Sequence, residues 1–415
     1  MKYFVLLCDG AADRKNEPAE KTPLEAASKP TVNMLSYRSF NGFVSGSFEK
    51  YRADIDAAHI AVLGFDPGQT EGFFPFEAAN AGASASGEDT VYKCSFLSLS
   101  EKKEAYENKK LLSVVTDLTK EETAKLISAL NKGLSTKIKK FYALSASEGC
   151  LVWKRAPENV ALTAPSDVSG AIGRYLPTGS SGAKIVPLLE KSCEVLADHP
   201  VNVKRREEGK KPVSTIWLHS PEKLPAIEPF EEKWKVTSAV ITNSPVLKGA
   251  AACLKMKTAD APVKDGAEDF EAEAKAVIDE FNAGTEFVML QTSAVSEAAL
   301  NGDRESKIKA IENVDSLVLA PVYEYLCGSG DQFKILFDTV LPAPVADKSF
   351  SEDPAPFFMY SSQRTEAGYK PFSEINAGKG GFHLPEGEGY KFMSFLVRIP
   401  APEKEETQEE NGQQQ

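Results

Sequence analysis

The segment Tyr3–Cys8 constrains the fold of this chain more than any other stretch. Its six residues are apolar without alternation, and Asp9 and Gly10 follow directly. A run of this kind is typical of a strand that is buried on both faces of a parallel sheet. Open α/β sheets bind their ligands beyond the carboxyl ends of the strands, which is where Asp9 would stand. A simple turn residue explains Asp9 equally well, so its role depends on the partners that the rest of the chain supplies.

The second half of the chain alternates short apolar runs with longer helix-like segments. Strands are expected at 215–218, 239–242, 286–291 and 333–337, and helices at 183–198, 267–282 and 304–324. Strands that alternate with substantial helices predict a parallel sheet covered by helices on both faces.

The middle of the chain has a different texture. Strands are expected at 92–99, 138–144 and 150–153, around an amphipathic helix at 120–132. Thr119 and Glu122 have the spacing of a capping box at the start of that helix. The pattern predicts a compact α+β module inserted into the larger α/β domain.

We therefore divide the chain into a discontinuous α/β domain, an inserted module and a tail. The α/β domain comprises residues 1–88 and 186–400, and the module comprises residues 89–185. Residues 401–415 carry five Glu and one Lys and almost no apolar side chain, so we expect a disordered acidic tail.

Composition limits the classes of partner and the compartment. The net charge of −12 argues against nucleic acid as a partner. No apolar run approaches the roughly 20 residues of a membrane span, and the N-terminus lacks a signal-peptide cleavage pattern. The six cysteines are scattered without a C-x-x-C pair, and we expect Cys8 and Cys94 to be buried free thiols. We expect a cytoplasmic protein.

Many short blocks of this sequence resemble, in the same order, the archaeal-type cofactor-independent phosphoglycerate mutases of the alkaline phosphatase superfamily. The resemblance covers nearly everything except the tail. The blocks are Asp9-Gly10, Lys21-Thr22-Pro23-Leu24-Glu25, Leu63-Gly64-Phe65-Asp66-Pro67, Pro75-Phe76-Glu77-Ala78-Ala79, His199-Pro200-Val201-Asn202, Leu247-Lys248-Gly249 and Asp353-Pro354-Ala355-Pro356-Phe357.

The resemblance implies an alkaline-phosphatase-like parallel sheet sandwiched by helices, with the inserted α+β module as a substrate lid. It also implies a phosphoryl transfer between the 3- and 2-hydroxyls of glycerate through a phosphoserine. Two divalent metals, usually manganese, zinc or magnesium, would activate that serine and hold the phosphate.

The residues that carry this chemistry in the family are replaced here. Ile55 stands at the position of the nucleophilic serine, and of the metal-ligand positions only Asp9 is retained. The substituted ligand positions are Ser296, Leu300, Val340, Leu341 and Phe350. Hydrocarbon side chains can neither bind a divalent cation nor attack phosphorus. We therefore expect no metal or other cofactor, and we expect the apolar replacements to gather in one pocket near Asp9.

The lid blocks are changed as well. Glu148 falls where the family has a phosphate-binding arginine, and Ser166-Asp167 fall on a block that ends in His-Asp in the family. The four histidines of the chain, at positions 59, 199, 219 and 383, are far apart in sequence. A metal site rich in histidine would need most of them in one place.

Four polar residues in retained blocks define a candidate residual anion pocket. His199, Asn202 and Arg205 would form it together with Lys248, if the two cations converge. The alternative is that His199, Asn202 and Arg205 only cap and fasten the transition from a helix to a loop.

Three functions are compatible with these observations. The first, which we favour, is a family member without catalysis that is kept for binding a phosphorylated small molecule or a protein partner. The second is a working 2,3-bisphosphoglycerate-independent phosphoglycerate mutase. The third is a rebuilt phosphotransferase or phosphatase. No membrane partner is expected, and the sequence does not determine an oligomeric state.

Overall fold

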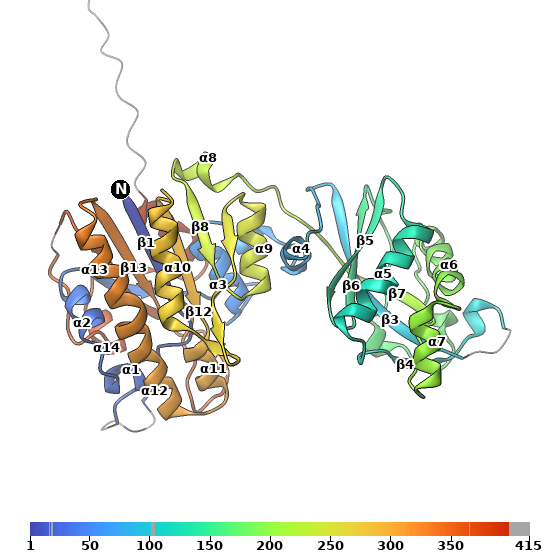
Figure 1. Ribbon diagram of the computed structural model, residues 1–415, viewed down its shortest axis with the longest axis horizontal. Helices are drawn as coiled ribbons and strands as arrows, with labels where there is room; N and C mark the ends of the chain where they lie inside the picture. The colour runs from blue at the N-terminus through green and yellow to red at the C-terminus, as the bar shows by residue number, and fades with distance from the viewer. Residues whose placement is uncertain (16, 18–19, 101–103, 365, 398–415) are drawn as a thin grey trace, which may run out of the picture.

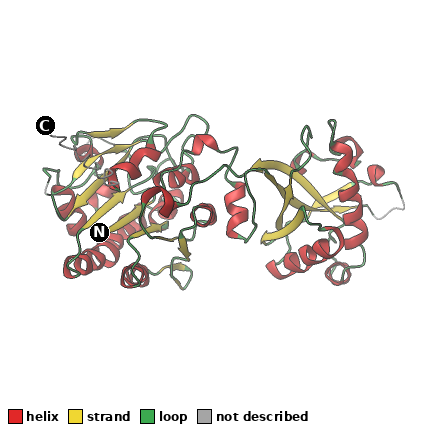
Figure 2. Ribbon diagram, turned by 90° about the horizontal axis from the view of Figure 1, so that it is seen from above, coloured by secondary structure: helices red, strands yellow, loops and turns green. Residues whose placement is uncertain are grey.

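The chain forms two bodies, each built around its own sheet. The structure is a computed structural model, and it describes residues 1–397 except for residues 16, 18–19, 101–103 and 365. The predicted tail, residues 401–415, lies outside the described residues. Figure 1 shows the larger body, the smaller body and the short helix α4 (Phe74–Asn80) between them, and Figure 2 shows the same division from above.

The larger body contains the predicted parallel sheet. Its eight strands lie in the order β15-β2-β14-β13-β1-β12-β8-β9, and only the pairs of β14 with β13 and with β2 are antiparallel. The strands are β1 (Lys2–Cys8), β2 (Phe40–Val44), β8 (Ser238–Ile241), β9 (Lys257–Ala259), β12 (Phe287–Thr292), β13 (Phe333–Asp338), β14 (Ala355–Ser361) and β15 (Phe382–Leu384). A separate hairpin joins β10 (Val263–Lys264) to β11 (Ala267–Glu268).

The strand β1 is the centre of this sheet and is covered on both faces. Its residues alternate between two apolar clusters, with Val5 and Leu7 in one and Phe4 and Leu6 in the other. This explains why the sequence of β1 is apolar without alternation. The fold class predicted from that strand is confirmed.

Helices cover the two faces of the larger sheet. The face of Val5 and Leu7 packs against α3 (Ile55–Val62), α8 (Phe230–Trp234), α9 (Pro245–Cys253) and α15 (Phe392–Leu396). The face of Phe4 and Leu6 packs against α1 (Pro23–Ala26), α2 (Pro30–Tyr37), α10 (Phe270–Asn282), α11 (Ala294–Leu300), α12 (Arg304–Asn313), α13 (Ala320–Gly328) and α14 (Glu374–Ala377). The single helix predicted for 304–324 is divided by a π-helical turn at Val314–Leu319. In the described part of the chain, no helix has the length and apolar character needed to cross a membrane.

The smaller body is an antiparallel sheet with helices on one face. Its strands are β3 (Asp89–Leu99), β4 (Leu111–Val114), β5 (Lys139–Ser145), β6 (Glu148–Lys154) and β7 (Thr215–Lys223). The helices α5 (Lys120–Leu134), α6 (Val186–Leu196) and α7 (Pro200–Glu207) lie on the side away from the larger body (Figure 1). The capping box of α5 is present, with Glu122 N–H donating to Thr119 Oγ1 at 3.1 Å and Thr119 N–H donating to Glu122 Oε2 at 2.8 Å. The two thiols expected to be free, Cys8 and Cys94, are buried and unbridged.

The smaller body extends further along the chain than the predicted boundary at residue 185. The strand β7 pairs with β3 from Thr215 to Lys223, and α6 and α7 contribute to the same apolar cluster as α5. The prediction was wrong here because the apolar run of β7 resembles the buried strands of the larger sheet. The chain therefore returns to the larger body only after Lys223.

Within the smaller body, α7 is fastened by polar side chains, of which Asn202 and Arg205 are buried. His199 caps the helix through Nδ1, which accepts from Val201 N–H at 3.3 Å. The Asn202 amide donates to the carbonyls of Leu196 and Val213 at 2.6 and 2.8 Å and accepts from Val213 N–H. The Arg205 side chain is fully buried and donates to Lys211 O at 2.9 Å. These contacts match the alternative that the residues fasten a helix-to-loop transition.

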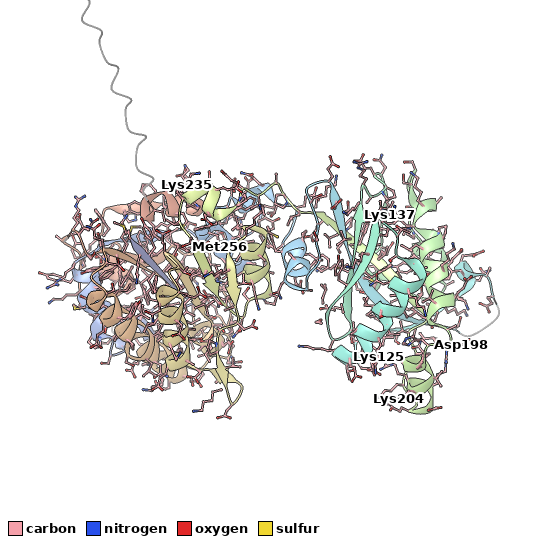
Figure 3. All side chains as sticks on the ribbon, turned by 45° about the horizontal axis from the view of Figure 1, so that its top comes forward. Lys125, Lys137, Asp198, Lys204, Lys235 and Met256 are labelled. Carbon is pink, nitrogen blue, oxygen red and sulfur yellow. The ribbon has the colours of Figure 1, made fainter. Side chains whose placement is uncertain are left out.

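Replacing Arg205 with Ala should destabilise the smaller body. The change removes an ion pair with Asp117 and leaves the Lys211 carbonyl without its Arg205 donor, at a cost of about 2–3 kcal/mol. Urea unfolding of the wild type and the variant measures the difference. The matched control is Lys204→Ala on the same helix, where the side chain is 72% exposed and the change should be within about 0.5 kcal/mol (Figure 3). Equal effects of the two changes would contradict the role of Arg205 as an anchor.

A buried carboxyl group on α10 makes the stability of the larger body depend on pH. The Glu273 side chain is fully buried, and neither of its oxygens has a hydrogen-bond partner in the described structure. Burial, together with the charges of Glu268 and Asp269, raises the pKa of Glu273 to about 8 from an ordinary value of 4.5. Between those two values the folded protein holds a proton that the unfolded chain has lost, so stability falls as pH rises.

Replacing Glu273 with Gln should remove this loss of stability. We expect the variant to gain stability relative to the wild type as pH is raised from about 5 to about 8, with little difference at the acidic end. Denaturant unfolding at several pH values in this window measures the trend. Glu271→Gln, an exposed position on the same helix, is the control and should leave the wild-type pH profile unchanged. A Glu273→Gln profile parallel to that of the wild type would refute the assignment.

Candidate functional site

The candidate site lies where three parallel strands of the larger sheet end side by side. Asp9 follows β1 directly, Gln291 lies near the end of β12, and Asp338 ends β13. Leu7 of β1 is in register with both Gln291 and Asp338, so these two residues lie level with each other, and Asp9 follows two residues beyond Leu7. The prediction that Asp9 stands at the carboxyl edge of a parallel sheet is confirmed.

Asp9 is buried and fully engaged by two neighbours. The His59 Nε2 atom, on α3, lies 3.0 and 2.9 Å from the two carboxylate oxygens of Asp9. The Gln291 amide donates to Asp9 Oδ2 at 2.8 Å and accepts from Thr242 Oγ1 at 2.6 Å. Burial alone lowers the pKa of the His59 imidazole, but the charge of Asp9 and the hydrogen bond to it outweigh burial and raise the pKa overall. Asp9 and His59 thus form a buried ion pair.

Asp338 is the second carboxyl group at this edge and is also completely buried. Its Oδ1 accepts from Val340 N–H at 2.9 Å, whereas Oδ2 has no partner in the described structure. Burial, with a contribution from the charge of Asp9, raises the pKa of Asp338 to about 7, although the hydrogen bond from Val340 N–H and the charge of His59 oppose the rise. The Nδ1 atom of His59 is likewise without a described partner.

Apolar side chains surround this polar group on the α3 side. Val340 and Leu341 are buried in the same cluster as Val5 and Leu7, and Ile55 and Phe350 pack against that cluster. A Cβ added to Gly46 would lie 2.6 Å from Val340 O, 2.9 Å from Leu341 Cδ2 and 3.2 Å from Ala58 Cβ. The loop after β13 is therefore closely packed against α3, the helix that begins at Ile55.

Val340 adopts a backbone conformation that is unfavourable for its side chain. Its φ is +62°, in the left-handed region that β-branched residues rarely enter. A conformation of this kind costs on the order of 1–3 kcal/mol and persists only where the surrounding structure enforces it. The loop after β13 thus keeps a shape that valine itself does not favour.

The other two substituted positions lie on α11 and differ from each other. Ser296 is buried close to the Asp9-Gly10 turn, since a Cβ added to Gly10 would lie 2.8 Å from Ser296 Cβ. Its hydroxyl donates to Ser293 O at 2.9 Å. Leu300 is 37% exposed and belongs to none of the apolar clusters of the described residues. The expectation that all the apolar replacements gather in one pocket is therefore wrong for Leu300, which ends its helix facing solvent.

The residues present do not fit the two-metal centre that the resemblance implies. Among the described residues, no group of three or more His, Cys, Asp or Glu side chains is arranged to hold a metal ion. Both carboxylate oxygens of Asp9 already have hydrogen-bond partners in His59 and Gln291, and the side chains of Asp9 and His59 are buried.

The structure does not form the candidate anion pocket. Arg205 is buried in the smaller body against Asp117, whereas Lys248 lies on α9 of the larger body and forms an ion pair with Asp260. Figure 1 shows α7 and α9 in different bodies. The prediction of a shared pocket of His199, Asn202, Arg205 and Lys248 is thus wrong, because each cation already has a carboxylate partner in its own body.

The changed lid positions lie apart from the polar group around Asp9. Glu148 begins β6, is exposed, and accepts from Ser145 Oγ at 2.8 Å. Ser166 and Asp167 lie in a short 3₁₀ turn, Pro165–Asp167, of the long connection after β6.

The sequence analysis did not identify the partners of Asp9. His59 appears in it only as one of the four histidines, Gln291 only as the end of the predicted strand 286–291, and Asp338 only as the residue after the predicted strand 333–337. The available signal is positional, because Gln291 ends one predicted parallel strand and Asp338 follows another, just as Asp9 follows a third.

Known proteins resemble this chain over nearly its whole length. A family model described as 2,3-bisphosphoglycerate-independent phosphoglycerate mutase matches residues 37–202. The phosphoglycerate mutase of that type from Methanosarcina barkeri is 30% identical over 392 residues, which cover 92% of this chain and 96% of the relative. A protein from Geobacter sulfurreducens described as a probable mutase of the same type is 29% identical, covering 96% of this chain and all of the relative.

Two solved structures share the fold. The cofactor-independent phosphoglycerate mutase from Thermoplasma acidophilum superposes with a TM-score of 0.72 at 20% identity, over 97% of this chain and all of that one. A protein from Pyrococcus horikoshii gives a TM-score of 0.70 at 22% identity, over 95% of this chain and 96% of that one. These likenesses establish the alkaline-phosphatase-like α/β fold.

The comparisons also correct the expectation about cofactors. We expected none, whereas the proteins to which this chain is related belong to a family that uses divalent metal ions. Family membership is thus shown by sequence over almost the full length, independently of the replaced site residues. This chain belongs to the 2,3-bisphosphoglycerate-independent phosphoglycerate mutase family.

Proposed function

We propose that this family member does not catalyse the phosphoserine-based mutase reaction and that its fold is retained for binding. The observation that carries the proposal is Ile55, which begins α3 and which the resemblance assigns to the family's nucleophile position. Its hydrocarbon side chain has no atom that can attack phosphorus or carry a phosphoryl group.

The surroundings of Ile55 support the same conclusion. Val340, Leu341 and Phe350 belong to one apolar core with it, so this part of the site is packed with hydrocarbon. Replacing a cluster of buried charges by apolar groups is often neutral or stabilising, which explains why the fold can persist without the chemistry. The retained Asp9 forms an ion pair with His59, so its charge is compensated within the protein.

The binding role is proposed without a defined pocket. The dispersal of Arg205 and Lys248 removes the main reason for placing a phosphorylated ligand between them. Of the two kinds of ligand that we expect, a phosphorylated small molecule or a protein, the protein partner therefore remains. A cytoplasmic location stays a prediction.

A working phosphoglycerate mutase is the second candidate, and the relatives support it. The protein from Methanosarcina barkeri is described as a mutase and that from Geobacter sulfurreducens as a probable mutase, and both align with almost the whole of this chain. The names of the relatives favour this candidate, whereas the side chains at the site favour the first. One assay distinguishes the two.

The purified protein should convert 3-phosphoglycerate to 2-phosphoglycerate at least about 10⁴-fold more slowly than an authentic mutase. Residues that act as one catalytic unit are strongly non-additive, and losing such a unit costs up to about 10⁶-fold. An enolase-coupled assay with Mn²⁺, Mg²⁺ and Co²⁺ supplied in turn measures the rate. The Methanosarcina barkeri protein is the positive control.

Two variants sharpen this assay. Ile55→Ser should remain inactive, because restoring the nucleophile alone leaves the ligand positions unfilled. If the wild type instead turns over within about tenfold of the control, the proposal fails, and loss of that activity in Asp9→Asn would place it at this site.

A further inference from the structure

The smaller body carries a serine–histidine pair on the sheet face that is not covered by α5, α6 and α7. Ser95 Oγ, on β3, lies 3.0 Å from His219 Nε2, on the neighbouring strand β7. His219 Nδ1 lies 3.0 Å from Ser220 Oγ. For Nε2 to accept the Ser95 proton, Nδ1 must carry the ring proton and donate it to Ser220. This arrangement of nucleophile, base and orienting group is the pattern of an activated serine.

A local irregularity of the sheet aims His219 at Ser95. Lys93 pairs with His219, but Tyr92 pairs with Pro221, so Ser220 is an extra residue on β7. Ser220 has a φ of +45°, in the left-handed region. Bulges re-aim side chains and are over-represented beside active sites, and strained residues cluster there as well.

The histidine is in its neutral form near physiological pH. Burial, together with the charge of Lys93, lowers the pKa of His219 to about 4, although the charge of Glu148 opposes them. An unprotonated imidazole can accept the hydroxyl proton at once. Ser95 and His219 are both partly exposed, so a small molecule can reach them.

The charges on this face select the class of substrate. Lys93 is opposite His219 in the ladder and two residues from Ser95 on the same face of β3. Its ammonium lies 4.9 Å from the Phe74 ring centroid, on α4. Glu77 of α4 lies within electrostatic reach of Lys93 and Glu148. Two carboxylates beside one ammonium disfavour a dianionic phosphate ester and suit an uncharged substrate.

We propose that Ser95 and His219 form a catalytic pair that cleaves small uncharged carboxylic esters. The Ser95 Oγ proton passes to His219 Nε2 as Oγ bonds to the ester carbonyl carbon. The tetrahedral oxyanion forms on the side of the Lys93 ammonium. Its collapse breaks the bond to the alkoxide, which takes the proton from Nε2. Water then hydrolyses the acyl-serine by the same route and regenerates the hydroxyl.

A fluorophosphonate probe tests the pair directly on the full chain. The wild type should become labelled at Ser95, identified by peptide mass, as fluoride leaves and an Oγ–phosphorus bond forms. Ser95→Ala should abolish this label. His219→Gln should slow it by about 100-fold, the lower end of what a positioned general base contributes. Ser128→Ala, an exposed serine on α5, should label like the wild type.

Hydrolysis of p-nitrophenyl acetate provides the turnover readout, with the same ranking of variants expected. Circular dichroism confirms that each variant is folded, and the site of the wild-type label needs no variant at all. Absence of the wild-type label, a label that persists in Ser95→Ala, or an unchanged rate in His219→Gln overturns the proposal. No phosphoglycerate enters these assays, so their outcome is independent of the mutase question.

Discussion

The convergence of β1, β12 and β13 at one edge of the larger sheet is the constraint on which the rest of the site depends. A parallel sheet directs the ends of neighbouring strands to the same place, so Asp9, Gln291 and Asp338 come together whatever their purpose. Buried polar groups must then be paired or neutral. Here His59 and Gln291 engage Asp9, and burial favours the protonated form of Asp338. The carboxyl edge of the sheet therefore keeps its polar side chains although they are buried.

The fold could be derived from the sequence because its signals are local. The unbroken apolar run of β1 reflects the burial of that strand on both faces. The capping box of α5 reflects a reciprocal pair of hydrogen bonds at the start of that helix. The boundary at residue 185 could not be derived, since β7 is apolar like a central strand and its partner β3 is more than a hundred residues earlier. Long-range pairing of this kind leaves no mark in a local pattern.

The site could be predicted only in part, for a related reason. The replaced positions follow from a block-by-block comparison, and four of the five apolar replacements do lie in one core or against it. Leu300 does not, because its exposure depends on what the end of α11 faces in space. The prediction of the anion pocket was wrong for the same reason, because it too depended on what the side chains face in space. Arg205 and Lys248 each carry the right charge, but each has a carboxylate close to it in its own body.

The loop after β13 takes its shape from the contacts around it rather than from the preference of its own residues. Val340 holds a positive φ that costs free energy, and the close packing of Gly46 against this loop leaves little room for relaxation. A loop free to relax would bring valine back to a favoured conformation. The strain is therefore enforced by neighbours, which include the Gly10–Pro342 bridge and the hydrogen bond from Ser351 N–H to Pro342 O. The surrounding contacts thus fix the backbone frame that carries the side chains at the sheet edge.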